Sequence, residues 1–341
     1  MNVGRGSGIA SRVAADRHRE DDTMNVRIAI AAAATVAAAS TLAAPTAAAP
    51  DDPATLAAPD IDVAAVQAHL DALQQIADEN GGNRATGTTG YRASVDYVTE
   101  QLETAGYTVT EQPFDTFGGE SYNITAELAG ADPSRVVMLG GHLDSVDAGA
   151  GINDNGSGSA GELATALAFA EANPNPSVTV RFAWWGAEEQ GLLGSSHYVD
   201  SLDAAELDRI DVYLNFDMIG SPNGGYFVYD GDDAVEGTFN EFLATRDIQT
   251  APTTVGGRSD HAAFEDAGVP IGGLFTGAEG TKTEEEAQLW GGTAGEPYDP
   301  CYHSECDTTA NIDPTMLDNM SDAMSYTVWS LTAPETLDDA A

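Results

Sequence analysis

Positive charge is scarce in this chain of 341 residues. Lysine occurs once, as Lys282, and Lys+Arg total 13 against 55 for Asp+Glu, so the formal net charge is −42. A surface of this charge repels nucleic acid and anionic membranes, so we expect binding to neither. A strongly acidic, lysine-poor surface suits solubility at high salt. A high-GC genome also depletes lysine, and the composition leaves these two explanations open.

Long apolar runs are also missing from the chain after residue 50, where no segment has 18 continuous apolar residues. No helix that spans a membrane is therefore expected there. Cysteine is nearly absent as well, since Cys301 and Cys306 are the two in the chain and they lack C-x-x-C zinc spacing. In an exported chain, two cysteines this close together are expected to form a disulfide, with two free thiols as the alternative.

The beginning of the chain has the composition of a targeting segment. Residues 24–49 start with methionine, contain one basic residue and continue with an alanine-rich apolar stretch, which predicts a secretory signal peptide. We interpret residues 1–23 as a mis-assigned start or an extension, and residues 50–57 as a pro-segment or linker. The alternative is a chain that starts at Met1 and uses the alanine-rich stretch as a membrane anchor. The folded domain is then expected over 58–334, followed by a flexible tail over 335–341.

Hydrophobic periodicity predicts alternating helices and strands within this domain. Amphipathic or apolar helical patterns cover residues 62–83, 90–107, 157–172, 234–246 and 315–332. Strand patterns cover residues 107–114, 121–130, 135–142, 177–185, 211–220, 226–230 and 270–277. Strands alternating with helices over this length predict one α/β globular domain, with a mixed, largely parallel central sheet flanked by helices.

Three of the predicted buried strands end in a histidine or in carboxylates. His142 ends "VVMLGGH", Glu188 and Glu189 follow "RFAWWGA", and Asp217 follows "YLNF". Because open α/β sheets bind ligands beyond the carboxyl ends of their strands, these side chains are expected to meet in one crevice. A glycine-rich loop, "GAGINDNGSGSAG", adds Asp154.

The late loop "PYDPCYHSECDT" adds Tyr302 and His303 to the same set of polar candidates. Two histidines and at least three carboxylates fit divalent metal, most plausibly zinc. Carboxylates packed together with no lysine nearby repel each other, and two dications would neutralise that charge. A two-metal centre needs one bridging carboxylate and two terminal ligands for each metal, and five residues suffice: His142, Asp154, Glu189, Asp217 and His303.

Glu188 is left over, and an unbound carboxylate beside such a centre is what a general base requires. Each residue taken alone has a plainer explanation. A histidine after a strand is usually structural, Asp154 could cap a helix, and a Glu-Glu pair commonly begins a solvated helix. Their joint position at strand ends favours the metal hypothesis.

Five segments resemble the secreted di-zinc aminopeptidases of the Streptomyces type. They are "GGHLDSVDAGAGINDNGSGSAG", "RFAWWGAEEQGLLGS", "YLNFDMIGSPN", "GRSDHAAF" and "PCYHSECDT", in order between about Ala58 and Leu331. The resemblance extends to the wider group of bacterial leucyl, Aeromonas-type and transferrin-receptor-like relatives. It implies the zinc-exopeptidase fold, which is phosphorylase/hydrolase-like, with two zinc ions in a single globule.

Residue roles follow from this resemblance position by position. Asp154 would bridge the two zinc ions, with His142 and Asp217 completing one ligand set and Glu189 and His303 the other. The resemblance makes Glu188 the general base and Tyr302 the donor to the oxyanion. It also places Arg258, with Glu188 and Asp217, near the substrate amine.

The resemblance also implies a hydrophobic pocket for the first substrate residue, with Phe275 and Met218 as candidate lining residues. Relatives of this subtype bind one calcium ion, and the matching positions here are Asp60, Ile61, Asp318 and Asp322. The segment "APDI" at Ala58 resembles the mature N-terminus of the family.

The expected function is a secreted, extracellular metallo-aminopeptidase that removes N-terminal, preferably leucine-like residues from peptides. The expected cofactors are two Zn²⁺ and one Ca²⁺, and the expected state is a monomer that binds no membrane after signal removal. A carboxylate-rich site favours a terminal ammonium, although Arg258 could hold a carboxylate. The alternatives are a di-zinc carboxypeptidase, amidase or deacylase on the same scaffold, or a relative without metals that only binds.

Overall fold

The computed structural model describes residues 57–172 and 175–332. The predicted signal peptide at 24–49, the segment before it and the tail at 335–341 lie outside the described residues. The predicted linker at 50–57 lies outside them except for its last residue. The predictions for these segments therefore stay predictions.

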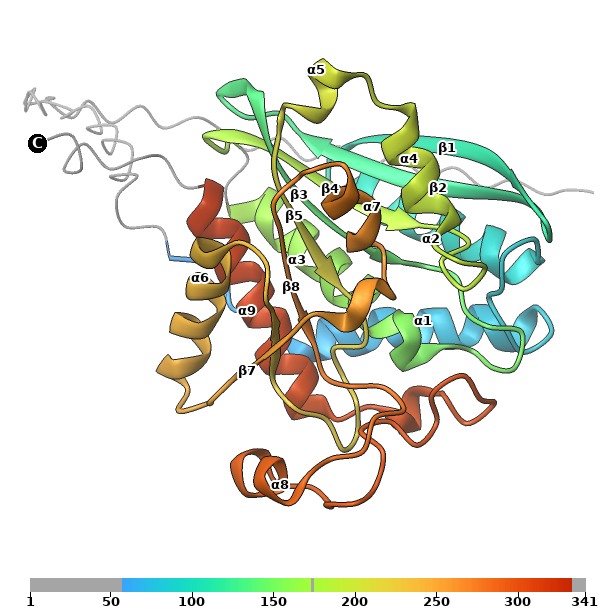
Figure 1. Ribbon diagram of the computed structural model, residues 1–341. Helices are drawn as coiled ribbons and strands as arrows, with labels where there is room; N and C mark the ends of the chain where they lie inside the picture. Colours follow the sequence, from blue (N-terminus) through green and yellow to red (C-terminus); the bar gives the residue numbers. More distant parts are fainter. Residues whose placement is uncertain (1–56, 173–174, 333–341) are drawn as a thin grey trace, which may run out of the picture. The chain divides into compact units, whose positions relative to one another are not determined.

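Helices and strands alternate along the described chain, as the hydrophobic pattern predicts (Figure 1). The α-helices are α1 (Val63–Glu79), α2 (Thr89–Thr104), α3 (Gly158–Ala172), α4 (Leu193–Ser201), α5 (Ala204–Leu207), α6 (Asp233–Thr245), α7 (His261–Asp266), α8 (Glu284–Trp290) and α9 (Pro314–Thr332). The strands are β1 (Thr108–Thr116), β2 (Gly119–Leu128), β3 (Asp132–His142), β4 (Val178–Trp185), β5 (Ile210–Phe216), β6 (Phe227–Tyr229), β7 (Ala251–Thr253) and β8 (Ile271–Phe275). The patterns did not predict α4, α5, α7, α8 and β7, which are all nine residues or shorter.

The strands form one mixed sheet in the order β1-β2-β4-β3-β5-β8-β6-β7. Strand β3 pairs in parallel with β4 and with β5, and β5 pairs in parallel with β8, so the centre of the sheet is parallel. The β1-β2, β2-β4 and β6-β8 pairs are antiparallel. The predicted mixed sheet with a parallel centre is confirmed.

Two layers of apolar side chains cover the two faces of this sheet, as expected for buried parallel strands. On β4, Phe182 and Trp184 pack in the larger core with side chains of α1, α2, α3 and α9. Ala183 and Trp185 point to the other face, where they join Phe264 of α7. All four side chains are fully buried. Burying a large apolar side chain contributes roughly 1.5–3 kcal/mol, so β4 is strongly fixed in register.

This arrangement determines where the polar strand ends lie. Strands β3, β4 and β5 run parallel, and their carboxyl ends are His142, Trp185 and Phe216. The residues that follow these strands therefore come together at one edge of the sheet, which is where ligands bind in open α/β folds. Within the described ranges, no helix combines the length and the apolar character that crossing a membrane requires.

Candidate metal centre and active site

Imidazole and carboxylate groups from three neighbouring strand ends converge at this edge of the sheet. The Nε2 atom of His142 lies 3.2 Å from Asp154 Oδ1 and 3.4 Å from Asp217 Oδ1. It also lies 3.9 Å from Glu188 Oε2. His142 is 1% exposed and Asp154 is 5% exposed, so the cluster is buried beneath the edge.

Asp154 links two histidines through its two carboxylate oxygens. While Oδ1 faces His142, Oδ2 lies 3.1 Å from Nε2 of His303. The same Nε2 atom of His303 lies 3.1 Å from Glu189 Oε2. This is the geometry that a bridging carboxylate requires, with one imidazole and one further carboxylate on each side.

Several buried oxygens in this cluster lack the partner that a buried charge normally has. Asp217 Oδ1 and Glu189 Oε1 accept no hydrogen bond, although both are enclosed. Two groups of side chains have ligand atoms within 4.8 Å of one another: His142, Asp154 and Glu189 in one, and His142, Glu188 and Asp217 in the other. Buried carboxylate oxygens that accept no hydrogen bond are costly unless a cation compensates them, so the donor set fits divalent metal.

The electrostatics of the cluster point the same way. Burial raises the pKa of Glu189 to about 7, and the neighbouring charge of Asp154 adds to this shift. The pKa of His303 rises to about 10 because its ring bonds to Asp154 and Glu189. Burial lowers the pKa of His142, but the carboxylates of Glu188 and Asp217 outweigh it and raise that pKa well above its usual value. The site therefore attracts positive charge, and protons on the histidines supply it when no metal is bound.

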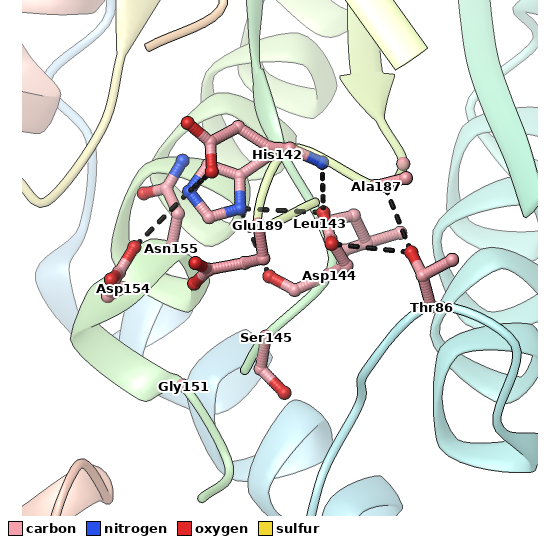
Figure 2. A network of polar contacts seen from close by, with 12 residues as sticks. Thr86, His142, Leu143, Asp144, Ser145, Gly151, Asp154, Asn155, Ala187 and Glu189 are labelled. Atoms are coloured by element: carbon pink, nitrogen blue, oxygen red, sulfur yellow. Dashed lines mark hydrogen bonds and ion pairs between the residues drawn. The ribbon is translucent and has the colours of Figure 1, made fainter. Parts of the chain in front are cut away.

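A second layer of hydrogen bonds holds the side chains of the cluster in place. His142 Nδ1 lies 3.0 Å from the backbone oxygen of Asp144, opposite its contact with Asp154 (Figure 2). The Asp144 carboxylate accepts a hydrogen bond from the backbone N–H of Glu188 and another from the Thr86 hydroxyl. Asp144 thus connects the end of β3 to the end of β4. The sequence reasoning missed it, although its position two residues after His142 was a usable signal.

Two further residues support the cluster in the same way. The Ser259 hydroxyl donates to Asp217 Oδ2 at 2.7 Å, which leaves Oδ1 directed at His142. Asp307 accepts hydrogen bonds from the backbone N–H groups of Asn153 and Asp154 at 2.8 and 3.0 Å. Such contacts orient ligands in metal sites. The sequence offered no signal for Asp307, because it lies far from Asp154 along the chain.

The turns that carry these side chains use an uncommon backbone conformation. Ala187, Met218 and His303 have φ of 57°, 54° and 55°, which is the left-handed region. These three residues lie before Glu188, after Asp217 and in the late loop. Non-glycine residues in this region are uncommon and concentrate at functional sites, so their positions agree with the location of the centre.

A cavity of about 370 Å³ opens directly beside the cluster. Its polar end includes Asp154, Glu188, Asp217 and His303, and Glu189 is not among the described residues that line it. Its apolar wall is formed by Met218, Phe227, Val255, Phe275, Ala278 and Tyr298. Both residues predicted to line a hydrophobic pocket, Met218 and Phe275, therefore line this cavity. Glu188 and Glu189 differ in that only the first of the two lines it.

Tyr302 and Arg258 lie together at the rim of this cavity. The Tyr302 ring stacks on His303 with centroids 3.8 Å apart, and its hydroxyl lies 3.3 Å from Arg258 Nη2. Burial and the charges of Asp154 and Asp217 raise the pKa of Tyr302, so the phenol stays protonated. Arg258 Nη1 also forms an exposed ion pair with Glu279 at 2.9 Å, a partner that the sequence reasoning did not identify.

The loop that presents Tyr302 and His303 is closed by a disulfide between Cys301 and Cys306. The predicted pairing is confirmed, and free thiols are excluded because these are the chain's two cysteines. The bond restricts a short loop that has no helix or strand of its own. It therefore helps to hold His303 opposite Asp154.

The residues expected to bind calcium also meet, beside the N-terminal half of α9. The Asp60, Asp318 and Asp322 carboxylates all face the guanidinium of Arg246, at distances of 3.5, 3.8 and 2.5 Å. The backbone N–H of Ile61 donates to Asp322. No described residue set of metal-binding geometry includes these aspartates.

Comparison with known proteins agrees with this geometry. Residues 123–328 match the sequence profile of Peptidase family M28. The chain belongs to peptidase family M28. This M28 peptidase is 52% identical over 292 residues to leupeptin-inactivating enzyme 1 of Streptomyces exfoliatus, a match that covers 82% of the chain and 67% of that protein. The resemblance inferred from the five sequence segments is therefore confirmed.

Other relatives carry aminopeptidase names. An aminopeptidase of Pseudomonas aeruginosa is 52% identical over 233 residues, with 64% of this chain and 43% of that protein covered. Leucine aminopeptidase 2 of Trichophyton equinum is 49% identical over 220 residues, a match that covers 61% of this chain and 44% of that protein. The M28 peptidase thus spans less than half of the length of these two relatives.

Solved structures share the fold of this M28 peptidase. A zinc aminopeptidase from Bacillus subtilis matches with a TM-score of 0.69 and 18% identity, covering 82% of this chain and 96% of that one. An aminopeptidase from an Aneurinibacillus species matches with a TM-score of 0.66 and 19% identity over the same shares. These similarities establish the zinc-exopeptidase type of fold that the sequence predicts.

Proposed function

We propose that this M28 peptidase is a two-zinc aminopeptidase that removes hydrophobic, leucine-like residues from the N-termini of peptides. The observation that carries the proposal is the position of Asp154, whose two carboxylate oxygens face His142 on one side and His303 on the other. Asp217 and Glu189 complete the two sides. The names of the relatives, aminopeptidase and leucine aminopeptidase, support the reaction class.

Zinc suits this donor set, because histidine nitrogen and carboxylate oxygen are its usual ligands in hydrolases. His142, Asp154 and Asp217 would hold one ion, and Asp154, Glu189 and His303 the other. When bound, zinc ions polarise the scissile carbonyl and lower the pKa of water. The buried oxygens of Glu189 and Asp217 that accept no hydrogen bond support this assignment.

Glu188 is proposed to move the proton. It lines the cavity beside the cluster, and its backbone is held by Asp144. Burial raises the pKa of Glu188 well above its usual value, and the charge of His142 opposes this shift. A carboxylate with a raised pKa accepts a proton from the attacking water and can return it to the leaving amine.

Tyr302 is proposed to stabilise the oxyanion that forms at the scissile carbonyl. Its phenol is protonated and lies at the rim of the cavity, next to His303. A hydrogen bond donated to an oxygen that gains negative charge strengthens in the transition state and lowers the barrier.

The charge of the site supports an aminopeptidase over a carboxypeptidase. Glu188 and Asp217 line the cavity and attract a terminal ammonium group. Arg258 is the group that could bind a terminal carboxylate, but it already pairs with Glu279. The apolar wall around Phe275 and Met218 supports a leucine-like first residue.

The decisive experiment compares leucine-p-nitroanilide with N-acetyl-leucine-p-nitroanilide. An aminopeptidase hydrolyses the first and not the second, because the acetyl group removes the ammonium that the carboxylates recognise. Equal hydrolysis of both would favour an amidase or deacylase. Hydrolysis of a blocked peptide from its C-terminus would favour a carboxypeptidase, and no hydrolysis by the zinc-loaded protein would favour a relative that only binds.

Secretion, a monomeric state and the absence of nucleic-acid or membrane partners are part of the proposal. The signal-like composition of residues 24–49 and the net charge of −42 support them. The intact mass of secreted protein should correspond to a chain that begins near Ala58. A chain that begins before Met24 would contradict this. The calcium ion expected from the resemblance is not part of the proposal, because the carboxylates expected to bind it face Arg246.

A further inference from the structure

Three carboxylates from two distant segments surround one arginine side chain. Arg246 Nη2 lies 2.5 Å from Asp322 Oδ2 and 3.5 Å from Asp60 Oδ1. Arg246 Nη1 lies 3.8 Å from Asp318 Oδ2. Asp60 precedes α1, Asp318 and Asp322 lie one turn apart on α9, and Arg246 caps the end of α6. The start of the described chain passes beside α6 and α9 (Figure 1).

The position of the guanidinium is fixed from several directions. The Cζ atom of Arg246 lies 4.9 Å from the centre of the Phe242 ring, and that ring packs against Tyr326 of α9. Nη1 donates to Asn319 Oδ1 at 2.9 Å. The residue caps the C-terminus of α6, where the helix dipole favours positive charge. The side chain is therefore built into this junction and does not extend freely into solvent.

Asp322 is the carboxylate that most needs this cation. It is 3% exposed, and its Oδ1 accepts a hydrogen bond from the Ile61 backbone at 2.6 Å while Oδ2 faces Arg246. Burial raises its pKa, and the hydrogen bond from Ile61 and the contact with Arg246 oppose that shift. A buried carboxylate that loses its partner destabilises a fold strongly. Asp60, at 89% exposure, contributes much less because water screens it.

Calcium does not fit the same space in the presence of this side chain. Calcium takes about six to eight oxygen ligands at about 2.3–2.6 Å. Here both Asp322 oxygens already have partners, and the guanidinium would repel a dication at this distance. Among the described residues, the side-chain groups with metal-binding geometry both lie in the active centre.

We infer that Arg246 supplies from within the chain the positive charge that ties the start of the domain to α9, in the place where the family resemblance implies a calcium ion. The stability of the protein consequently does not depend on calcium. This inference does not depend on the proposed peptidase activity, because it concerns a junction outside the active centre.

The test compares the purified zinc-loaded protein with Arg246→Leu in the presence and absence of calcium. Melting temperature is measured with roughly 10 mM CaCl₂ and with MgCl₂ at the same concentration, which exceeds the about 10⁻⁴–10⁻³ M dissociation constants of extracellular calcium modules. Calcium binding is measured separately by titration calorimetry. Arg135→Leu is the matched control, because Arg135 forms an exposed ion pair with Asp211 and its loss changes the net charge equally.

We expect no calcium binding and no calcium-specific shift for the wild type or for Arg135→Leu. Arg246→Leu should melt a few degrees lower and should regain much of that loss with calcium but not with magnesium. Calcium binding by the wild type would overturn the inference, as would an Arg246→Leu protein that does not respond to calcium. If Arg246→Leu does not fold, Arg246→Lys replaces it, and the wild-type titration still decides the claim.

Discussion

Glu188 and Glu189 provide a matched pair of substitutions that tests the proposed division of roles. Both are neighbouring glutamates after β4, and changing each to glutamine removes one charge with little change in shape. They differ in position, since Glu188 lines the cavity and Glu189 faces His303. The same substitution should therefore lower the catalytic rate at position 188 and the amount of bound zinc at position 189.

The effect expected for Glu188→Gln is a loss of rate without a loss of metal. The Glu188 backbone N–H donates to Asp144 whatever the side chain is, so the turn should stay in place. General acid–base catalysis contributes roughly 10²–10⁴-fold in rate. At about 1.36 kcal/mol for each factor of ten, the barrier should rise by about 2.7–5.4 kcal/mol. Zinc content should remain at two ions per chain under the proposal.

The effect expected for Glu189→Gln is a loss of metal. Its Oε2 lies 3.1 Å from His303 Nε2, which in turn lies 3.1 Å from Asp154 Oδ2. A neutral amide in that position is a poorer zinc ligand, so bound zinc should fall and activity should partly return when zinc is added in excess.

The assay combines zinc per chain, from elemental analysis, with kcat on leucine-p-nitroanilide for the wild type and both variants. The reasoning is refuted if Glu188→Gln loses a metal while Glu189→Gln keeps both. Unchanged metal and unchanged rate in both variants would refute it more deeply, because the whole cluster at the strand ends would then be structural.

Three further outcomes are expected. The melting temperature should rise between low and molar NaCl, because a net charge of −42 is screened as the Debye length falls from about 8 Å at 0.15 M to about 3 Å at 1 M; a flat curve would show that the charges are too dispersed to matter. Hydrogen bonds to Asp154 and Glu189 raise the pKa of His303 from 6.5 to about 10. The protonated His303 ring therefore stabilises the zinc-free protein fully below about pH 6.5, and this stabilisation is lost as pH rises through about 10. The melting temperature of zinc-free protein should therefore fall over that interval, and an equal slope in His303→Gln would contradict the assignment. Replacing Cys301 and Cys306 by serine should lower stability by about 2 kcal/mol on the chain-entropy argument and weaken zinc binding, and unchanged zinc affinity by titration would show that the bond does not support His303.

Much of the fold was predictable because its signals are local. The buried strands β3, β4 and β5 are short apolar runs, and each ends in a residue of the centre or is followed by one within a few positions. The parallel arrangement of strands separated by helices then places those residues at one edge. The elements that the patterns missed, such as α7 and α8, have only six and seven residues, so apolar spacing cannot repeat over several helical turns.

The supporting residues were less predictable, because their role depends on contacts across long stretches of sequence. Asp307 accepts hydrogen bonds from the Asp154 loop, and Glu279 pairs with Arg258 across the rim of the cavity. In the sequence, each is one acidic residue among 55. No local pattern distinguishes a carboxylate that supports a site from one that faces solvent.

By itself the sequence determined the α/β class, the family resemblance and the set of histidines and carboxylates at the strand ends, because periodicity and motif order are properties of neighbouring residues. Only the tertiary structure decided that Asp154 divides its two oxygens between His142 and His303. It also decided that the carboxylates expected to bind calcium surround the charge of Arg246. The physical reason is the same in both cases: electrostatic partners are chosen by distance in space, and folding brings together charges from segments that share no local pattern.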